Sequence, residues 1–381
     1  MSASRPPIPV VAHTLGERER AAAAAVLAGE AITTGPQAHA FEADLAAWTG
    51  TDTVLAVNSC TAALHLALLA CDLGPGDEVI TSPVTFPATI NVIRLVGATP
   101  VLADVDPVTL NLDPAAVARA ITPRTRAILP VHMGGVACDM HALGQIADAH
   151  GLRTIADAAH AIDTRHAGAH VADLGDLCAF SFYATKNMTT VEGGALCGDP
   201  SLVERARTLS RHGLRFDWGP DHASVARGYE PAAPGLKYNM TDVAAAIGRV
   251  QLDRLPDLQR RRRSAAAAYD AALDGHPSLA APPGAAERDD QGLYLYQAEV
   301  RRPEDRPALC ELLADAGVTT GFYYTPLHHY ALYANAARGP LPGADRAVGR
   351  FVALPMHAAL DDRAVARVVA ALAATRSLTT P

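Results

Sequence analysis

The chain has 381 residues, of which 49% are hydrophobic and 19% are charged, and its formal net charge is −8. This length and apolar content allow one large domain with a smaller one attached. The acidic balance, and the lack of a basic tract with interleaved aromatic residues, argue against nucleic acid as a partner. No apolar stretch reaches the ~18 residues of a membrane span, and the first residues lack the apolar core of a signal peptide. We therefore expect no membrane partner.

The six cysteines are scattered and form no Cys-x-x-Cys pair. This pattern disfavours zinc ribbons and disulfide frameworks and predicts a reducing, cytoplasmic location. Two pairs of possible metal ligands stand out, Cys138 with His141 and His328 with His329. Neither pair has further candidate ligands nearby in the sequence, so we expect no metal site.

Short apolar runs alternate with helical patterns over the first two-thirds of the chain, which predicts an α/β fold with a parallel sheet covered on both faces. The expected strands are residues 54–57, 78–81, 101–103, 127–131, 153–156, 177–182 and 195–197. A strand at 293–300 and helices at 306–316 and 364–374 predict a smaller α+β domain after these. We place the boundary between residues 1–255 and residues 256–381.

A long helix is expected between these two parts, from about Thr241, a plausible N-cap, to Arg263. Its last four residues, Arg260 to Arg263, are the only basic cluster of the chain. A solvated face of the helix is the expected role of this cluster.

Lysine is rare in this chain, because only Lys186 and Lys237 stand against thirty arginines. Arginine cannot replace lysine where a neutral amine must attack a carbonyl, since it never deprotonates in proteins. Lys186 follows an apolar run and precedes the sequence Glu192-Gly193-Gly194. This setting favours a positioned amine of the kind that forms Schiff bases; the alternative is a leftover surface lysine.

Three further sets of candidate site residues follow other expected strands. Residues 58–61, Asn-Ser-Cys-Thr, close a strand and open a helix, and so offer an anion site. Asp157 ends another strand, and Phe86 opens a helical segment after a third. Taken singly, these residues are also compatible with helix caps and an ordinary core phenylalanine. Together with Lys186 they form the set that pyridoxal phosphate needs: an anion cradle, a carboxylate for the ring nitrogen, an amine for the aldehyde and an aromatic cover.

Over nearly its whole length, the chain resembles the sugar aminotransferase family typified by the DegT, DnrJ, EryC and StrS proteins. The motifs that carry the resemblance are residues 33–36 (TTGP), 58–65 (NSCTAALH), 76–80 (GDEVI), 130–132 (PVH), 157–161 (DAAHA), 181–187 (SFYATKN), 192–194 (EGG) and 237–242 (KYNMTD). The resemblance implies the type I fold of pyridoxal-phosphate-dependent transferases. In that fold a large domain holds a mostly parallel seven-stranded sheet between helices, and a smaller C-terminal α+β domain follows.

The resemblance also implies roles for individual residues. Lys186 would form the Schiff base and carry the proton, Asp157 would pair with the pyridine nitrogen, and His160 would lie near the oxygen side of the ring. Phe86 would stack on the ring. The phosphate would be held by Ser59, Cys60, Thr61 and Ser181, joined by Asn239 from the neighbouring subunit. The substrate-binding residues would be Thr34, Lys237 and Tyr323.

The chain departs from the family pattern at several positions. Cys60 stands where the family usually has glycine, a change that keeps the backbone N–H. Tyr294 and Tyr296 occupy a strand region where a histidine is common. Tyr323-Tyr324 stands where His-Tyr is frequent. These tyrosines fall at positions that face the substrate in the family, so they bear on the choice of substrate more than on the chemistry.

The implied function is that of a homodimeric aminotransferase with an active site shared between subunits. It would move an amine from L-glutamate to a keto group of a nucleotide-linked deoxysugar, a 4-keto-6-deoxyhexose. A dehydratase branch of the family carries histidine at the lysine position, so Lys186 favours amino transfer. The alternatives are an aminotransferase for keto-inositols, an enzyme similar to 3-amino-5-hydroxybenzoate synthase, and a non-catalytic regulator. The sequence leaves open the sugar, its nucleotide and the carbon that is aminated.

Overall fold

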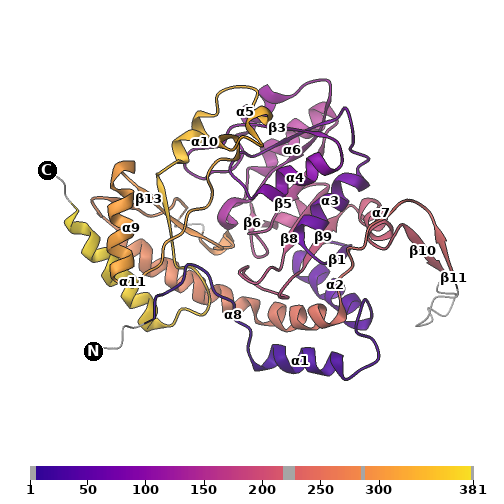
Figure 1. Cartoon of the computed structure of the whole chain (residues 1–381), viewed down its shortest axis with the longest axis horizontal. Helices are drawn as coiled ribbons and strands as arrows, with labels where there is room; N and C mark the ends of the chain where they lie inside the picture. Colours follow the sequence, from indigo (N-terminus) through magenta and orange to yellow (C-terminus); the bar gives the residue numbers. More distant parts are fainter. Residues whose placement is uncertain (1–5, 218–227, 285–287, 379–381) are drawn as a thin grey trace.

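The computed structural model describes residues 6–217, 228–284 and 288–378. Its centre is a seven-stranded sheet with the strand order β1-β9-β8-β5-β4-β2-β3 (Figure 1). The strands are β1 (Val54–Val57), β2 (Glu78–Thr81), β3 (Thr99–Leu102), β4 (Thr125–Leu129), β5 (Arg153–Asp157), β8 (Leu177–Ser181) and β9 (Gly194–Gly198). Among the described residues, β9 pairs antiparallel with both β1 and β8, and the other pairings in this sheet are parallel. The expected α/β fold with a mostly parallel sheet is confirmed.

Successive apolar side chains along the strands point to opposite faces of this sheet. Helices therefore cover both faces. In β1, Leu55 and Val57 pack with α3 (Cys60–Ala70), α4 (Pro87–Leu95) and α7 (Pro200–Ser210). Val54 and Ala56 point the other way, into a core shared with α2 (Pro36–Thr49) and α8 (Asp242–Leu273). On that same second face, the side chains of β2, β3 and β4 pack with α5 (Pro114–Ala120) and α6 (Met140–His150).

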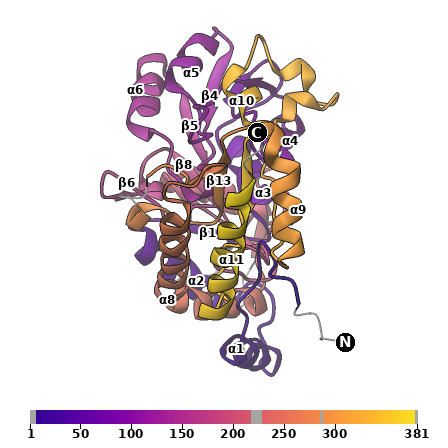
Figure 2. The ribbon, with the colours of Figure 1, turned by 90° about the vertical axis from the view of Figure 1, so that its left-hand side faces the viewer.

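The C-terminal part has its own antiparallel sheet and its own core. The sheet contains β12 (Leu279–Ala280), β13 (Tyr296–Val300) and β14 (Phe351–Leu354). Helices α9 (Arg306–Asp315) and α11 (Asp362–Ala374) pack with the second half of α8 on this sheet (Figure 2). A further helix, α10 (Pro342–Ala347), lies beside the large sheet. We propose a division after residue 255, which falls inside α8, so that one helix joins the two parts.

Helix α8 begins where the sequence predicts and continues past the expected end, to Leu273. The side chain of Thr241 accepts a hydrogen bond from the amide of Ala244, as an N-cap does. The expected role of the arginine cluster was wrong for one member. Arg262 is 1% exposed, and its guanidinium donates to the carbonyls of Leu293 and Met356.

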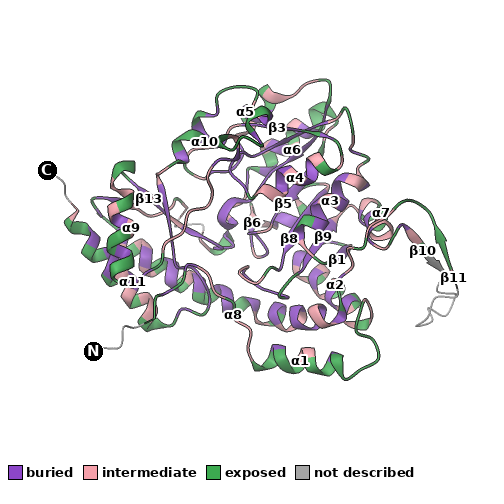
Figure 3. Cartoon of the chain, in the orientation of Figure 1, coloured by how far each residue is buried: buried purple, intermediate pink, exposed green. Residues whose placement is uncertain are grey.

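Several elements were not among those expected. Helix α1 (Glu17–Leu27) lies against α8 and is largely exposed (Figure 3), and the preceding arm pairs Ile8 with Val318. Two small hairpins are formed by β6 (Arg165–His166) with β7 (Ala169–His170) and by β10 (Leu214–Asp217) with β11 (Gly228–Pro231). Over the described ranges, no helix is both long enough and apolar enough to cross a membrane.

Candidate active site

A cavity of about 520 Å³ opens at the carboxyl ends of β1, β2, β4, β5 and β8. This is the edge of an open α/β sheet where ligands bind. The expected site residues that line it are Ser59, Cys60, Thr61, Phe86, Asp157, His160, Ser181, Lys186 and Tyr323. Thr34, Lys237 and Asn239 are not in its lining.

The first turn of α3 forms one end of the cavity. Ser59 is the N-cap of this helix, and its hydroxyl accepts from the amide of Ala62 at 3.1 Å. The amides of Cys60 and Thr61 have no partner inside the helix and so are suited to bind an anion. Strand β9 starts directly against this turn, and a Cβ on Gly194 would lie 2.5 Å from the Cys60 nitrogen. The second glycine of the Glu-Gly-Gly motif is thus needed for a close approach of two backbones.

Asp157 is the last residue of β5 and is held by two donors. Its Oδ2 accepts from the Thr89 hydroxyl at 2.8 Å, and its Oδ1 accepts from the amide of Ala159 at 3.1 Å. The carboxyl is buried, and burial raises its pKa, although both hydrogen bonds and the nearby Lys186 oppose that change. A cationic ring nitrogen at this place would supply the opposite charge that a buried carboxylate requires.

Lys186 lies in a turn after β8, where its amide donates to the carbonyl of Tyr183 at 2.9 Å. Its side chain lines the cavity, and burial lowers its pKa to about 8, partly opposed by Cys60 and Asp157. Its Nζ lies 4.3 Å from the centre of the Tyr294 ring, a cation–π distance. A lysine with this pKa supplies a neutral amine near neutral pH, as Schiff-base formation requires.

His160 is enclosed by aromatic rings. It stacks on Tyr294 with a centroid distance of 4.3 Å, and on Tyr324 at 6.2 Å. Its Nδ1 accepts from the amide of Gly134 at 3.3 Å, so its Nε2 carries the proton and faces the Tyr324 hydroxyl at 3.4 Å. Burial and Lys186 hold the pKa of His160 well below its usual range. The imidazole is therefore a neutral, fixed donor.

Cys60 and Phe86 both line the cavity. The Cys60 thiol lies 3.7 Å from the carbonyl oxygen of Ala179 and 4.0 Å from Oδ1 of Asp157, and burial keeps its pKa well above the usual range. A protonated thiol thus stands beside the buried carboxylate. Phe86 is the N-cap of α4 and is 60% exposed, with its ring 6.2 Å from that of Tyr324.

Three expected site residues lie outside the cavity. Asn239 and Thr34 contact each other, and Lys237 contacts the segment that precedes α3. Asn239 donates from Nδ2 to the Thr34 hydroxyl at 2.7 Å, and its backbone pairs with Val57 at the end of β1. The carbonyl of Lys237 accepts from the Asn58 side chain at 3.5 Å. We also expect cations between Arg211 and Arg227 to meet an anionic substrate; residues 218–227 lie outside the described residues.

Sequence reasoning missed Thr89 and did not assign a role to Tyr294. Thr89 lies one helical turn after Phe86, on the face of α4 that turns toward β5, and its hydroxyl is shared with Thr85 at 2.8 Å. Thr85 precedes the helix, so this hydroxyl pair arises from the chain's entry into α4, and no local sequence pattern marks it. Tyr294 comes from the distant β13 region, and only its departure from the family pattern marks it.

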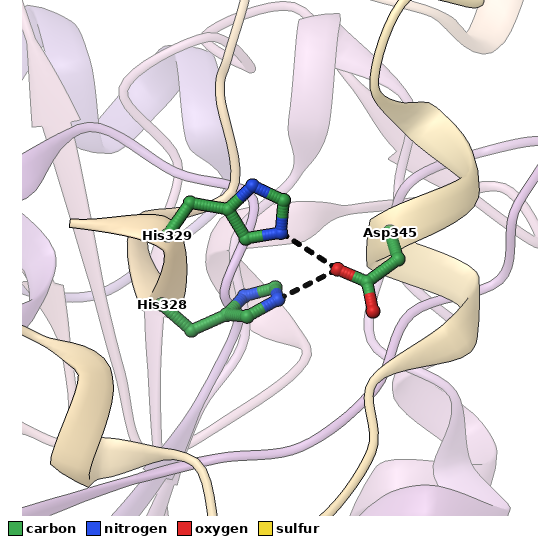
Figure 4. A group of neighbouring side chains, drawn as sticks. All are labelled: His328, His329 and Asp345. Carbon is green, nitrogen blue, oxygen red and sulfur yellow. Dashed lines mark hydrogen bonds and ion pairs between the residues drawn. The ribbon is translucent and has the colours of Figure 1, made fainter.

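His328 and His329 have no further candidate ligand close in the sequence, but the fold brings a third one next to them. Asp345 in α10 lies beside both rings (Figure 4). Its Oδ1 is 2.8 Å from Nε2 of His328 and 2.7 Å from Nε2 of His329. Asp345 is distant from the two histidines in the sequence, so its proximity depends on the packing of α10 and is not visible from the sequence.

Comparison with known proteins agrees with this geometry. Residues 13–373 match the DegT/DnrJ/EryC1/StrS aminotransferase family. The chain belongs to this family. It is 38% identical over 353 residues to the spore coat polysaccharide biosynthesis protein SpsC of Bacillus subtilis, and the match covers 90% of each chain.

Solved structures show the same fold. The aminotransferase TlmJ of Streptoalloteichus hindustanus is 38% identical, with a TM-score of 0.91 over 98% of this chain and 100% of that one. The sugar aminotransferase Spr1654 of Streptococcus pneumoniae, solved in its PLP form, is 30% identical, with a TM-score of 0.89 over 98% and 100% of the two chains. The expected type I transferase fold is confirmed, and the protein is a pyridoxal-phosphate-dependent sugar aminotransferase.

The residues of the cavity fit this cofactor. The amides of α3 suit its phosphate, the buried Asp157 suits its ring nitrogen, and the Lys186 amine suits its aldehyde. When bound, the cofactor supplies an electron sink for the carbon that exchanges its proton. The structure thus brings together the three chemical functions that the sequence predicted at separate strand ends.

Proposed function

We propose that this enzyme transfers the amino group of L-glutamate to the keto group of a nucleotide-linked deoxysugar, a 4-keto-6-deoxyhexose. The observation that carries the proposal is the composition of the cavity wall. Phe86, Tyr294, Tyr323 and Tyr324 contribute aromatic faces and hydroxyls, and Lys186 is the only lysine or arginine in the lining formed by described residues. Such a wall suits an uncharged sugar ring with an apolar methyl group, because aromatic faces pack against apolar C–H surface.

The charged part of the substrate must then lie beyond this wall. A pyrophosphate needs cations or N–H donors, and the first turn of α3 is engaged by the cofactor phosphate. Arginines of the stretch Arg211 to Arg227, together with Lys237 near the end of β1, are the proposed partners. The match to SpsC, whose name places it in polysaccharide biosynthesis, supports a sugar substrate.

The residues that line the cavity have separate tasks in this proposed reaction. Asp157, held by Thr89 and Ala159, keeps the ring nitrogen protonated, since an adjacent carboxylate raises the pKa of a cation. Lys186 would move a proton from the donor carbon that bears the amino group to the cofactor carbon that bears the nitrogen, and would move a proton the opposite way on the sugar side. Neutral His160 would orient the oxygen side of the ring. Tyr294 and Tyr324 hold His160 in place and exclude water from it.

We further propose that two subunits share each active site. Phe86 is 60%, Tyr183 47% and Val191 49% exposed, although Phe86 and Tyr183 line the cavity and Val191 adjoins it in sequence. These apolar surfaces suit coverage by a second copy of the chain. Asn239 and Lys237, which lie outside their own cavity, would then complete the site of the partner.

A substrate panel tests the proposed function. The enzyme is first converted by L-glutamate to its amine form, followed by absorbance, and is then offered nucleotide-linked 4-keto-6-deoxyhexoses, the free keto sugars and keto-inositols. We expect only the nucleotide-linked sugars to restore the aldehyde form rapidly. Equal rates with keto-inositols would support the aminocyclitol alternative instead. No conversion by any amino donor would support the regulator.

We also propose a cytoplasmic location. All six cysteines are free thiols, and Cys60, Cys138, Cys178 and Cys197 are buried. A reducing compartment preserves such thiols. Fractionation of the native host, with the protein detected in the soluble fraction after removal of the envelope, is the expected result; recovery from the cell exterior would contradict it.

A further inference from the structure

We propose that His328, His329 and Asp345 form a binding site for a late first-row divalent cation, with zinc as the reference ion. The two histidines end the short helical turn Leu327–His329, and Asp345 lies in α10 (Figure 4). Their ligand atoms all lie within 4.8 Å of one another. This site lies outside the cavity lining, and the proposal does not depend on the proposed function.

The ligand types select the class of ion. Two imidazole nitrogens and one carboxylate oxygen suit zinc, cobalt, nickel or copper, whereas magnesium and calcium prefer oxygen ligands alone. Both Nε2 atoms face the same oxygen, Oδ1 of Asp345, from which they lie 2.8 and 2.7 Å away. Neighbouring ligands with bonds of about 2.0–2.1 Å stand about 3.3–3.4 Å apart at the tetrahedral angle that zinc prefers. Each imidazole nitrogen would therefore have to move about 0.6 Å away from Oδ1 to receive an ion.

The exposure of the cluster fits an ion that keeps water ligands. The side chain of His328 is 14% exposed, that of His329 39% and that of Asp345 53%. Protein atoms thus supply one side of the coordination shell, and solvent can complete the other. The Nδ1 atom of His328 is buried without a hydrogen-bond partner among the described residues. Because tight sites anchor the outer nitrogen of each histidine, we expect affinity in the micromolar range, below that of structural zinc sites.

The location of the cluster indicates what an ion would do. The chain between the two histidines and Asp345 packs on α4, where the Tyr333 hydroxyl donates to Asn91 at 2.8 Å and Arg94 donates to the carbonyl of Leu332 at 2.8 Å. The amide of Leu327 donates to the carbonyl of Pro83 at 2.7 Å. A bound ion would close this segment into a loop fixed at both ends. It would thereby stabilise the support of α4, the helix that begins after Phe86.

Zinc binding to the cofactor-loaded protein tests the proposal. Equilibrium dialysis against ZnCl₂, with metal analysis of the protein, should show one ion per chain that is absent from His329→Asn and Asp345→Asn. Both side chains are accessible, so these variants should fold, which circular dichroism verifies; His328→Asn, at a less exposed position, is a supporting variant. The matched control is His141→Asn, which removes an exposed histidine bonded only to Gln145 in the described structure and should leave binding unchanged.

Two further readouts separate this site from thiols and from the cofactor. Cobalt at the site should give the weak visible bands of nitrogen and oxygen ligands, without the intense charge-transfer band of thiolates. Zinc should raise the melting temperature of the wild type and of His141→Asn, but not of Asp345→Asn. We expect each single variant to lose affinity at least about tenfold. Unchanged binding in His329→Asn or Asp345→Asn, or no binding by the wild type, would overturn the proposal.

Discussion

At the scale of single residues, the chemistry depends on an amine that arginine cannot replace. Lys186→Arg should fold but should lose all transamination, because a guanidinium does not become a neutral nucleophile. Borohydride reduction of the loaded wild type should attach the cofactor to the Lys186 peptide, as mass spectrometry would show. The matched control is Lys237→Arg, which removes the only other lysine and should retain this labelling. A label found on Lys237 would refute the assignment.

Tyr294 acts on the same amine through its ring. A cation 4.3 Å from an aromatic centroid is stabilised by about 0.5–2 kcal/mol, and one pKa unit corresponds to about 1.4 kcal/mol. Tyr294→Leu keeps the site apolar but removes the π face, so the ammonium form of Lys186 is disfavoured. We expect the pKa of Lys186, about 8 before the change, to fall by up to about one unit.

The pKa is measured as the pH dependence of chemical modification of Lys186 in the cofactor-free protein. The neutral amine reacts, so the midpoint of the reaction rate should move to lower pH in Tyr294→Leu. Tyr294→Phe retains the ring and should keep the midpoint of the wild type. An upward movement in Tyr294→Leu would mean that water entry outweighs the loss of the ring.

At the scale of elements, the anion cradle depends on two backbones that touch. Gly194→Ala would place a methyl group 2.5 Å from the Cys60 nitrogen, so α3 or β9 must move. We expect weaker binding of the cofactor phosphate, by about tenfold or more if one or two hydrogen bonds to a charged group are lost. The measurement is titration of the cofactor-free protein with pyridoxal phosphate.

The control for this variant is Gly144→Ala in α6, where an added Cβ meets no atom within 4 Å. Because alanine favours a helix over glycine, Gly144→Ala should bind the cofactor normally and should be slightly more stable. Normal cofactor affinity in Gly194→Ala would show that the first turn of α3 tolerates displacement.

The elements differ in how far the sequence predicts them. The strands of the large sheet were predicted because each is a short apolar run before a polar strand end. Arg262 was assigned to a solvated face from its charge alone, although it is spaced four and seven residues before the buried Ala266 and Tyr269. Helical period outweighs charge there, since backbone carbonyls satisfy the guanidinium. Thr89, Tyr294 and Asp345 reach their partners by tertiary packing, which a local pattern does not encode.

At the scale of the whole molecule, the proposed shared site predicts complementation between inactive variants. Lys186→Ala abolishes chemistry in its own cavity, and Asn239→Ala weakens the site of its partner. In a hybrid dimer the two lesions fall in one site and leave the other intact. Unfolded and refolded mixtures should therefore regain up to about a quarter of wild-type activity if subunits pair at random. At a cofactor concentration too low to load Asn239→Ala, neither variant refolded alone should regain activity, and a fully active monomer would refute the shared site.

The arm before α1 has a mechanical consequence. Ile8 exchanges backbone hydrogen bonds with Gly317 and Thr319, and the amide of Met356 donates to the carbonyl of Val10. The next residue, Val11, lines the cavity. The start of the chain is thus tied to the C-terminal part while it contributes to the wall of a site built on the large sheet. Any hinge rotation of the C-terminal part would carry Val11 with it, so that the arm would turn domain closure directly into a change in the width of the pocket.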